Sequence, residues 1–535
     1  MNAVMNTTGT RRWWALGALT LSVLAIGLDG TILSVALPTL AHELHATESD
    51  LQWFSASYLL TLAAAMLPVG LLGDRIGRKK VLVASLLLFG LGSVACAFAP
   101  SPAFFIAARS VLGVAGAGII VMSLSALTVL FSETERPRAV GVWAASNFLA
   151  LPIGPILGGW ILTNYWWGWV FLINAPVALI GLLAAVALVP ESRASERTGL
   201  DPVGIVSSTA GLVILTYGII EAGRNGWDDR AALVEIAVGA LLLVGFFLWE
   251  YWLARRPGGQ PMLDLSLFRS ASFTWGVILL TILVIAMIGV IFTMPQFFQG
   301  VQGTDAMGSG VRLLPLIGGL VLGAVPADRV ARLLGAKITA ALGFAVLAGG
   351  MFLGARTEVN SSVGFVAVWM AVVGFGMGLT LATCASGAIS ELSAERAGVG
   401  SAVMQALQKV GGPLGTAILG SVLSATYIAS LDVSGLPPAL AAVVKEGLFS
   451  GLAVAAKLGS PELLASVQSA FVDGMNAALT VGAGIAVAGF VLTLIFLPNR
   501  PKAAQAVQTT QGSDTFEGSP ADTVKSEHEQ SVTRR

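Results

Sequence analysis

The segment Leu71–Lys80 reads LLGDRIGRKK, and a partial copy of it, VPADRVARLLGAK, occupies Val325–Lys337. Each is a short charged loop between two long apolar runs. The aligned positions are Asp74 with Asp328, Arg75 with Arg329, Gly77 with Ala331, and Arg78 with Arg332, an offset of 254 residues. Self-similarity at a fixed offset is the sequence signature of an internal repeat. The two loops therefore predict a chain made of two homologous halves.

A second pair of segments supports the same division. The dipeptide Gly154–Pro155 lies inside an apolar run and recurs as Gly412–Pro413, at an offset of 258 residues. Two basic loops could resemble each other by chance, but a further match at nearly the same offset favours a repeat.

Composition predicts that these halves lie in a membrane. The chain has 535 residues, of which 55% are hydrophobic and 11% charged, whereas soluble domains are about 25% charged. Apolar runs long enough to cross a bilayer recur along nearly the whole length. Fourteen spans are predicted, centred near Leu24, Leu62, Leu87, Leu112, Leu149, Leu179, Leu212, Leu242, Ile282, Leu316, Phe344, Met370, Gly411 and Ile485. The fold class is therefore an all-α polytopic membrane protein.

Two equal halves and fourteen spans give two six-helix bundles with two helices inserted between them. The basic residues gather in alternate loops, which predicts that both termini are cytoplasmic. The expected units are a cytoplasmic N-terminus (1–13), a first six-helix bundle (14–198), two inserted spans (199–260), a second bundle (261–500) with an external hairpin at about 425–471, and a disordered cytoplasmic tail (501–535).

The longer stretch GLLGDRIGRKKVL, Gly70–Leu82, resembles the loop signature of the major facilitator superfamily, G-x-L-a-D-r-x-G-r-k. The resemblance implies two parallel six-span bundles with a substrate site near the membrane midplane. It also implies a latch that holds the outward-open state and breaks on inward opening. The expected latch residues are Gly70, Asp74, Arg75, Gly77, Arg78, Asp328, Arg329 and Arg332. Simple anchoring by positive loops explains the basic residues, but it does not explain Asp74 or the spaced glycines.

The stretch from Gly141 to Gly159 resembles the antiporter signature of exporters in this superfamily, G-x8-G-x3-G-P-x2-G-G, with Ala150 in place of one glycine. Small residues spaced four apart let a neighbouring helix approach closely. The motif residues are Gly141, Gly154, Pro155, Gly158 and Gly159, echoed by Gly412 and Pro413. Ordinary small-residue packing is the alternative, but the spacing of the whole set resembles exporters in particular.

Two charged residues inside spans suggest proton coupling. RSVLGVAGAG, Arg109–Gly118, resembles the R-x-x-x-G motif of the fourth span, which implies a coupling role for Arg109. GLDGTILSVALP, Gly27–Pro38, resembles the first-span motif of the fourteen-span drug:H+ antiporters, the Qac/Emr-type multidrug exporters. A charged residue within a span is a functional candidate by default, and we expect Asp29 to couple proton and substrate. The alternatives are structural: an arginine that caps carbonyl groups, and an aspartate that only accepts a hydrogen bond.

The expected substrate cavity contains Asp29, Tyr58, Asn147, Gln405, Gln408 and Lys409. Lys409 lies about ten residues into its span and shares a helical face with Gln405. It could be the counter-ion of Asp29 or of another acid, or it could contact anionic or neutral substrates. Relatives with cationic substrates carry an acid in the second span, where this chain has Ala56 and Ser57. Both departures weaken the case for dicationic substrates.

The sequence also excludes some functions. It has no G-x-x-x-x-G-K-[ST] loop, so we expect the proton motive force, and not ATP or a cofactor, to supply the energy. We identify no metal site and no catalytic constellation of an enzyme. The expected function is proton-coupled efflux of lipophilic drugs, cationic ones among them, by a monomer in the lipid bilayer of a bacterial inner membrane, without nucleic acid. The alternatives are an exporter of a single metabolite or lipid, and a transport-inactive sensor.

Overall fold

The structure is a computed structural model that describes residues 9–131, 135–193, 201–256, 259, 261, 265–390 and 394–498. The tail predicted to be disordered, 501–535, lies outside these residues. In the part described, the regular elements are helices. The helices of the first half are α1 (Gly9–Glu43), α2 (Glu48–Ile76), α3 (Arg78–Ala97), α4 (Pro102–Leu130), α5 (Arg136–Asn164), α6 (Trp169–Leu172) and α7 (Asn174–Leu188).

Two helices follow before the second half begins, α8 (Pro202–Asn225) and α9 (Arg230–Arg255). The elements of the second half are η1 (Leu267–Arg269), α10 (Ala271–Gln296), η2 (Phe297–Val301), α11 (Ala306–Arg312), α12 (Leu314–Ala324), α13 (Ala327–Leu334), α14 (Ala336–Gly354), α15 (Val363–Ser390), α16 (Ala394–Ser430), α17 (Pro438–Lys445), α18 (Leu448–Leu458) and α19 (Pro461–Phe496).

Side-chain caps fix where several of these helices begin. Thr47 accepts a hydrogen bond from the Asp50 amide (3.2 Å) and donates its own amide to the Asp50 carboxylate (2.9 Å), which is a capping box at the start of α2. Ser101, Ser270 and Ser460 cap α4, α10 and α19 by their side chains alone, each accepting from an amide three residues on.

The predicted spans each fall in a separate helix or broken helix. Twelve helices among the described residues are long and apolar enough to cross a membrane, and α2, bent by 47° near Pro68, makes thirteen. The span predicted near Leu149 corresponds to α5, a helix of 29 residues. The protein is thus an all-helical, multi-pass membrane protein, as the composition predicts.

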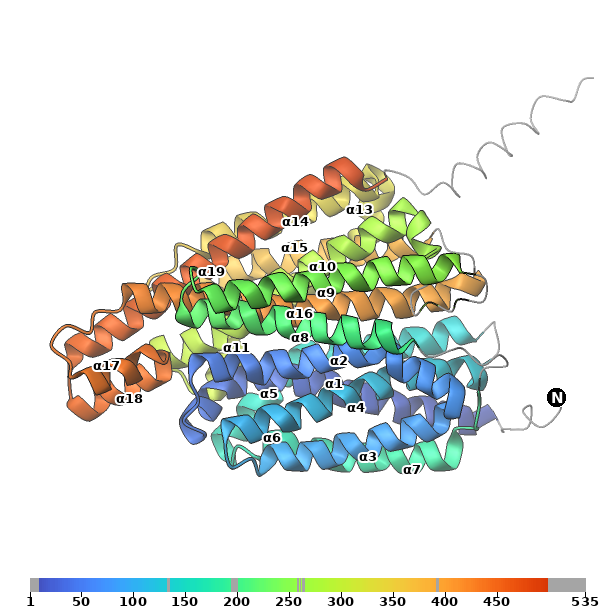
Figure 1. Cartoon of the computed structure of the whole chain (residues 1–535), viewed down its shortest axis with the longest axis horizontal. Coiled ribbons are helices and arrows are strands. Elements are labelled where there is room, and N and C mark those ends of the chain that lie inside the picture. The colour runs from blue at the N-terminus through green and yellow to red at the C-terminus, as the bar shows by residue number, and fades with distance from the viewer. Residues whose placement is uncertain are drawn as a thin grey trace, which may run out of the picture.

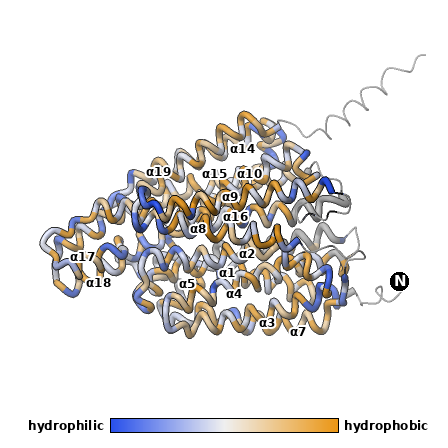
Figure 2. The backbone as a smooth tube through the Cα atoms, in the orientation of Figure 1, coloured by the Kyte–Doolittle hydropathy of each residue, from blue (hydrophilic) through white to orange (hydrophobic). Residues whose placement is uncertain are grey.

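The long helices run side by side along the horizontal axis of Figure 1, with α1–α7 in the lower layer, the long second-half helices α10, α14, α15, α16 and α19 in the upper layer, and α17 and α18 projecting at the left end. We call the end that carries Asp74–Arg78 and α13 the loop end, and the end that carries α17 and α18 the hairpin end. Figure 2 shows hydrophilic residues at both ends and a hydrophobic middle, which is the pattern that a bilayer requires.

The inserted helix α8 contacts both halves. Ile219 and Ile220 form a small buried cluster with Ala56 of α2 and Ala417 of α16. Helix α9 packs on α8 and places Phe246 against the core of the second half, but only 17% of its most apolar stretch is buried. In a membrane protein such exposed apolar surface faces lipid.

The two halves share a backbone feature that the sequence alignment misplaces. Gly77 (φ +123°) separates α2 from α3, and Gly335 (φ +87°) separates α13 from α14. Glycine reaches these conformations without the steric cost that a side chain imposes. The structural counterpart of Gly77 is therefore Gly335, at the same offset of 258 as the Gly-Pro pair, and not Ala331. An insertion of four residues after Asp328 explains the shift.

Candidate functional site: a central cavity with two polar centres

A cavity of about 560 Å³ lies between the two halves, within the range of sites for small molecules. Most of its wall is aliphatic or aromatic, and Met287 and Met404 add side chains that adapt readily to different shapes. The polar residues on the wall are Thr31, Ser34, Ser55, Tyr58, Arg109 and Trp143 from the first half, and Gln405, Gln408, Lys409 and Thr416 from α16. Four of the expected cavity residues therefore lie on its wall.

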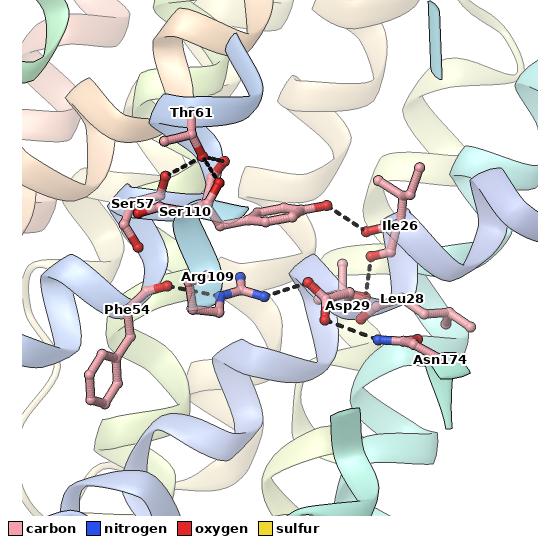
Figure 3. A network of polar contacts seen from close by, with 12 residues as sticks. Ile26, Leu28, Asp29, Phe54, Ser57, Thr61, Arg109, Ser110 and Asn174 are labelled. Atoms are coloured by element: carbon pink, nitrogen blue, oxygen red, sulfur yellow. Dashed lines mark hydrogen bonds and ion pairs between the residues drawn. The ribbon is translucent and has the colours of Figure 1, made fainter. Parts of the chain in front are cut away.

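Asp29 and Arg109 form an ion pair inside the first half (Figure 3). Each residue is only 1% exposed. One carboxylate oxygen of Asp29 accepts from the Arg109 guanidinium, and the other accepts from Nδ2 of Asn174 at 3.1 Å. We call Asp29, Arg109 and Asn174 the paired centre. Both oxygens of the only acid in this group are thus satisfied.

Arg109 is held by further contacts. Its Nε donates to the Phe54 carbonyl at 3.2 Å, and its guanidinium lies 4.3 Å from the centroid of the Tyr58 ring. The Tyr58 hydroxyl donates to the Ile26 carbonyl at 3.3 Å. The arginine therefore caps a carbonyl, as the structural alternative expects, and also pairs with an acid, while its coupling role stays a prediction.

Asn174 is the member of the paired centre that sequence reasoning missed. The sequence analysis expected Asn147 in the cavity, but the side chain of Asn147 and the surroundings of Gly141 lie outside the described residues. Asn174 begins α7 and is 2% exposed. A polar amide inside an apolar run was the available signal, because such groups need buried partners.

Gln405, Gln408 and Lys409 lie on the cavity face of α16, and we call them the open centre. Within the described part of the chain, none of the three side chains makes a hydrogen bond, and no acidic side chain lies close enough to Lys409 to compensate its charge. The structure does not show the Asp29–Lys409 pair that one sequence alternative expected. Arg109 is the counter-ion of Asp29.

The exporter motif lies where α5 meets its neighbours. A Cβ on Gly154 would lie 2.8 Å from Thr31 Cβ, and one on Gly158 would lie 2.8 Å from Ile32 Cγ2, so both glycines pack α5 against α1. A Cβ on Gly159 would lie 2.7 Å from the Ala306 carbonyl of α11, in the other half. The close approach of these helices therefore depends on glycine.

The second copy of the Gly-Pro pair, Gly412–Pro413, lies at the contact between α2 and α16. A Cβ on Gly412 would lie 2.9 Å from Leu59 Cδ1 of α2, and Pro413 lies inside the continuous helix α16. Further along the same contact, Gly420 packs on Gln52. The two Gly-Pro elements thus sit on two of the helix pairs that join the halves, α5 with α11 and α2 with α16.

Hydrogen bonds at the hairpin end also join the halves. Gln299 of η2 donates to the Val35 carbonyl of α1 at 3.0 Å. The Glu48 amide donates to the Glu446 carbonyl at 2.8 Å, and Gln296 donates to the Glu48 carboxylate at 3.4 Å. The cavity, by contrast, extends toward the loop end as far as Leu124 and Ala324. The described contacts between halves therefore close the cavity at the hairpin end.

The latch residues of the first half pair within that half. Arg78 donates to Asp74 at 2.8 and 2.9 Å, and its amide donates to the Ser192 carbonyl at 2.9 Å. A Cβ on Gly77 would lie 2.6 Å from the Glu191 carboxylate, and Gly70 packs α2 on Val121 of α4. The contacts described for this loop thus tie it to its own half.

The copy of the latch in the second half is arranged differently. Asp328, Arg329 and Arg332 are exposed on α13, and Arg75 is exposed in the first half. In the part of the chain that the structure describes, these four side chains make no ion pair. The same part contains no group of three or more histidine, cysteine, aspartate or glutamate side chains that could hold a metal ion.

Comparison with known proteins places this architecture in a family. The family model described as Major Facilitator Superfamily matches residues 19–416. The tetracenomycin C resistance and export protein of Streptomyces glaucescens is 30% identical over 90% of this chain and 91% of its own length. The multidrug efflux pump LfrA of Mycolicibacterium smegmatis is 31% identical over 90% of this chain and 96% of its own length.

Solved structures agree on the fold. A bacterial homolog of the human lysosomal transporter Spinster superposes with a TM-score of 0.66 at 17% identity, covering 92% of this chain and 99% of the other. A D-xylose-proton symporter gives 0.59 at 14% identity, covering 91% and 98%. The chain therefore belongs to the Major Facilitator Superfamily, whose members are secondary transporters rather than enzymes.

Proposed function

We propose that this protein exports lipophilic small molecules across the bacterial inner membrane in exchange for protons. The observation that carries this proposal is a largely apolar cavity whose wall includes one member of a buried Asp–Arg pair. The relatives named for drug or antibiotic export support the outward direction. No bound cofactor is needed, because the proton motive force supplies the energy.

In this proposal Asp29 carries the proton. With Asp29 ionised, its charge and that of Arg109 cancel, and Asn174 satisfies the second oxygen. Protonation would leave Arg109 as an uncompensated buried charge, and loss of one partner of a buried pair costs about 3–5 kcal/mol. A change of that size is enough to reverse a two-state equilibrium that is unfavourable by a few kcal/mol. Proton binding can therefore favour one conformation of the transporter over the other.

The proposed orientation places the loop end and both termini in the cytoplasm, because basic residues gather at that end. The hydrogen bonds described between the halves lie at the hairpin end, so the cavity would face inward in this structure. Outward opening would then require α5 to part from α11 and Gln299 to release Val35. The protein would act as a monomer, since one chain supplies both halves of the cavity.

A transport experiment tests this proposal. Cells that express the protein are loaded with a lipophilic dye, and efflux is followed with and without a protonophore, for wild type and for Asp29→Asn. We expect efflux by the wild type that the protonophore abolishes, and loss of proton-driven efflux in the variant. Wild-type efflux that ignores the protonophore would contradict antiport. A variant that exports normally and remains sensitive to the protonophore would remove Asp29 from the coupling step.

A second candidate function, export of one compound only, follows from the relatives that are named for single products, such as the probable actinorhodin transporter of Streptomyces coelicolor. The same efflux assay with a panel of dyes and antibiotics of unrelated shapes separates the two. Export of several unrelated compounds supports a multidrug exporter, and export of one compound class supports the dedicated one.

A further inference from the structure

The two walls of the cavity differ in how their polar groups are used. On the first-half wall, Thr31 donates to the Ala150 carbonyl, Ser34 to the Thr31 carbonyl, and Trp143 to Ser123. Tyr58 and Arg109 are also hydrogen-bonded within that half. Among the described residues of this wall, Ser55 is the one polar side chain without such a bond. The first-half wall therefore offers a ligand few free donors and no free charge.

On the wall formed by α16, most polar side chains have no partner among the described residues of the protein. Thr416 donates to the Gly412 carbonyl one turn earlier, but the three side chains of the open centre are unused. They bring an ammonium group and two amides to a wall that is otherwise apolar. The described wall contains no carboxylate, because Asp29 lies behind it and is already neutralised by Arg109. The one uncompensated charge on the described wall is thus that of Lys409.

We propose that this cavity selects lipophilic acids, that is, apolar or aromatic molecules with a carboxylate, sulfonate or phenolate, through an ion pair with Lys409. Gln405 and Gln408 would donate hydrogen bonds to the same acidic group, and the apolar wall would take the body of the molecule. This assignment rests on the proposed function and names its substrate class. It replaces the expectation that cations are among the substrates.

Two electrostatic arguments support the assignment. A charge moved from water into an apolar site costs free energy unless a partner compensates it, and an anionic ligand supplies that partner for Lys409. A cationic ligand would add a second positive charge to a wall that has no described acid to balance it. The same site would thus attract acids and disfavour cations of equal size.

A matched pair of fluorescent ligands isolates the acidic group. 8-Anilinonaphthalene-1-sulfonate and N-phenyl-1-naphthylamine share one ring system and differ by the sulfonate. Binding of each to the purified full-length protein in nanodiscs is measured by fluorescence, with empty nanodiscs subtracted. The variants are Lys409→Met and Lys409→Arg, and the matched control is Lys457→Met, which removes the same charge from an exposed position on α18.

We expect Lys409→Met to weaken binding of the sulfonate by about tenfold or more, the worth of one charge-assisted hydrogen bond, and to leave binding of the neutral amine within twofold. Lys409→Arg should retain the sulfonate, and Lys457→Met should behave as wild type. Retained binding of the neutral amine shows that Lys409→Met still folds. Equal losses for both ligands, or no loss for the sulfonate, would overturn the assignment.

The outcomes also separate this inference from the proposed function. Sulfonate binding that depends on Lys409, in a protein whose efflux ignores the protonophore, would keep the ligand class and reject antiport. Protonophore-sensitive efflux together with sulfonate binding that does not depend on Lys409 would keep antiport and reject the ligand class.

Discussion

The paired centre and the open centre lie in corresponding bundles of one repeat, yet they treat charge in opposite ways. In the paired centre, an acid, a base and an amide satisfy one another almost completely out of contact with solvent. In the open centre, a base and two amides face the cavity without a partner. One half therefore holds a centre that is complete without a ligand, and the other half holds one that is not.

This difference suggests a division of roles. A neutral, buried pair changes state when a proton arrives, because the proton removes one of two balanced charges. An uncompensated cation on the wall changes state when an anion arrives. The first half would thus respond to protons and the second half to the transported molecule, and the substitutions below separate the two responses.

The largest effect is expected from breaking the paired centre on one side. Arg109→Met leaves Asp29 buried without a cation, and should lower the free energy of unfolding by about 3–5 kcal/mol, measured as loss of thermal stability in detergent. Asp29→Leu combined with Arg109→Met should recover most of that stability, because apolar groups can replace a buried pair at little cost, but efflux should no longer follow the proton gradient.

The control for this pair is Arg230→Met, since Arg230 is exposed at the start of α9. It should unfold at the wild-type temperature. A double variant as unstable as Arg109→Met alone would show that the arginine is held for its contacts with Phe54 and Tyr58, and not as the partner of Asp29.

A smaller effect is expected from reversing the charge of the open centre. Lys409→Glu should lower the affinity for the anilinonaphthalene sulfonate by about tenfold and raise the affinity for the cation ethidium by about tenfold. Together this is a change of about 2.8 kcal/mol in their relative binding free energy. Uptake of each dye into inverted vesicles measures the ratio, and Lys457→Glu is the control. A uniform loss of both dyes would mean that Lys409 supports the shape of the cavity and not its charge preference.

The smallest effect is expected when the paired centre loses its amide but keeps both charges. Asn174→Ala removes one hydrogen bond to a carboxylate, worth about 1.5 kcal/mol, so proton-driven efflux should fall by roughly tenfold or less and still respond to a protonophore. Asn164→Ala is a matched control, because Asn164 is exposed and donates to the Trp160 carbonyl of its own helix. Complete loss of coupling in Asn174→Ala would give the amide a role equal to that of Arg109.

Much of the fold could be predicted because membrane spans and repeated motifs are visible in short stretches of sequence. A span is visible as an apolar run, and the repeat is visible because charged loops and Gly-Pro pairs interrupt such runs. The charged members of the paired centre could be named for the same reason, since Asp29 and Arg109 stand out against apolar neighbours. Their mutual contact could not be predicted from spacing, because it joins α1 to α4 across 80 residues.

The misses have physical causes as well. Asn174 is the first residue of a helix, a position where a polar side chain is common without any functional role. Its partner Asp29 lies 145 residues away in the sequence. Gly77 was aligned with Ala331 instead of Gly335 because an insertion changes the distance from the aspartate to the turn, while the backbone preserves the turn itself. The missing partner of Lys409 could not be seen in the sequence, because a pattern of residues does not show which groups remain unsatisfied after packing.

The position of α8 has a consequence for how a molecule dissolved in the bilayer could reach the cavity. The α2–α16 seam is covered on its lipid side by α8, which contacts both helices. Among the described residues, neither inserted helix packs on the α5–α11 seam. The insertion therefore makes the transporter one-sided: a lipophilic compound diffusing in the leaflet would meet α8 at the α2–α16 seam, but would reach the α5–α11 seam without passing an inserted helix.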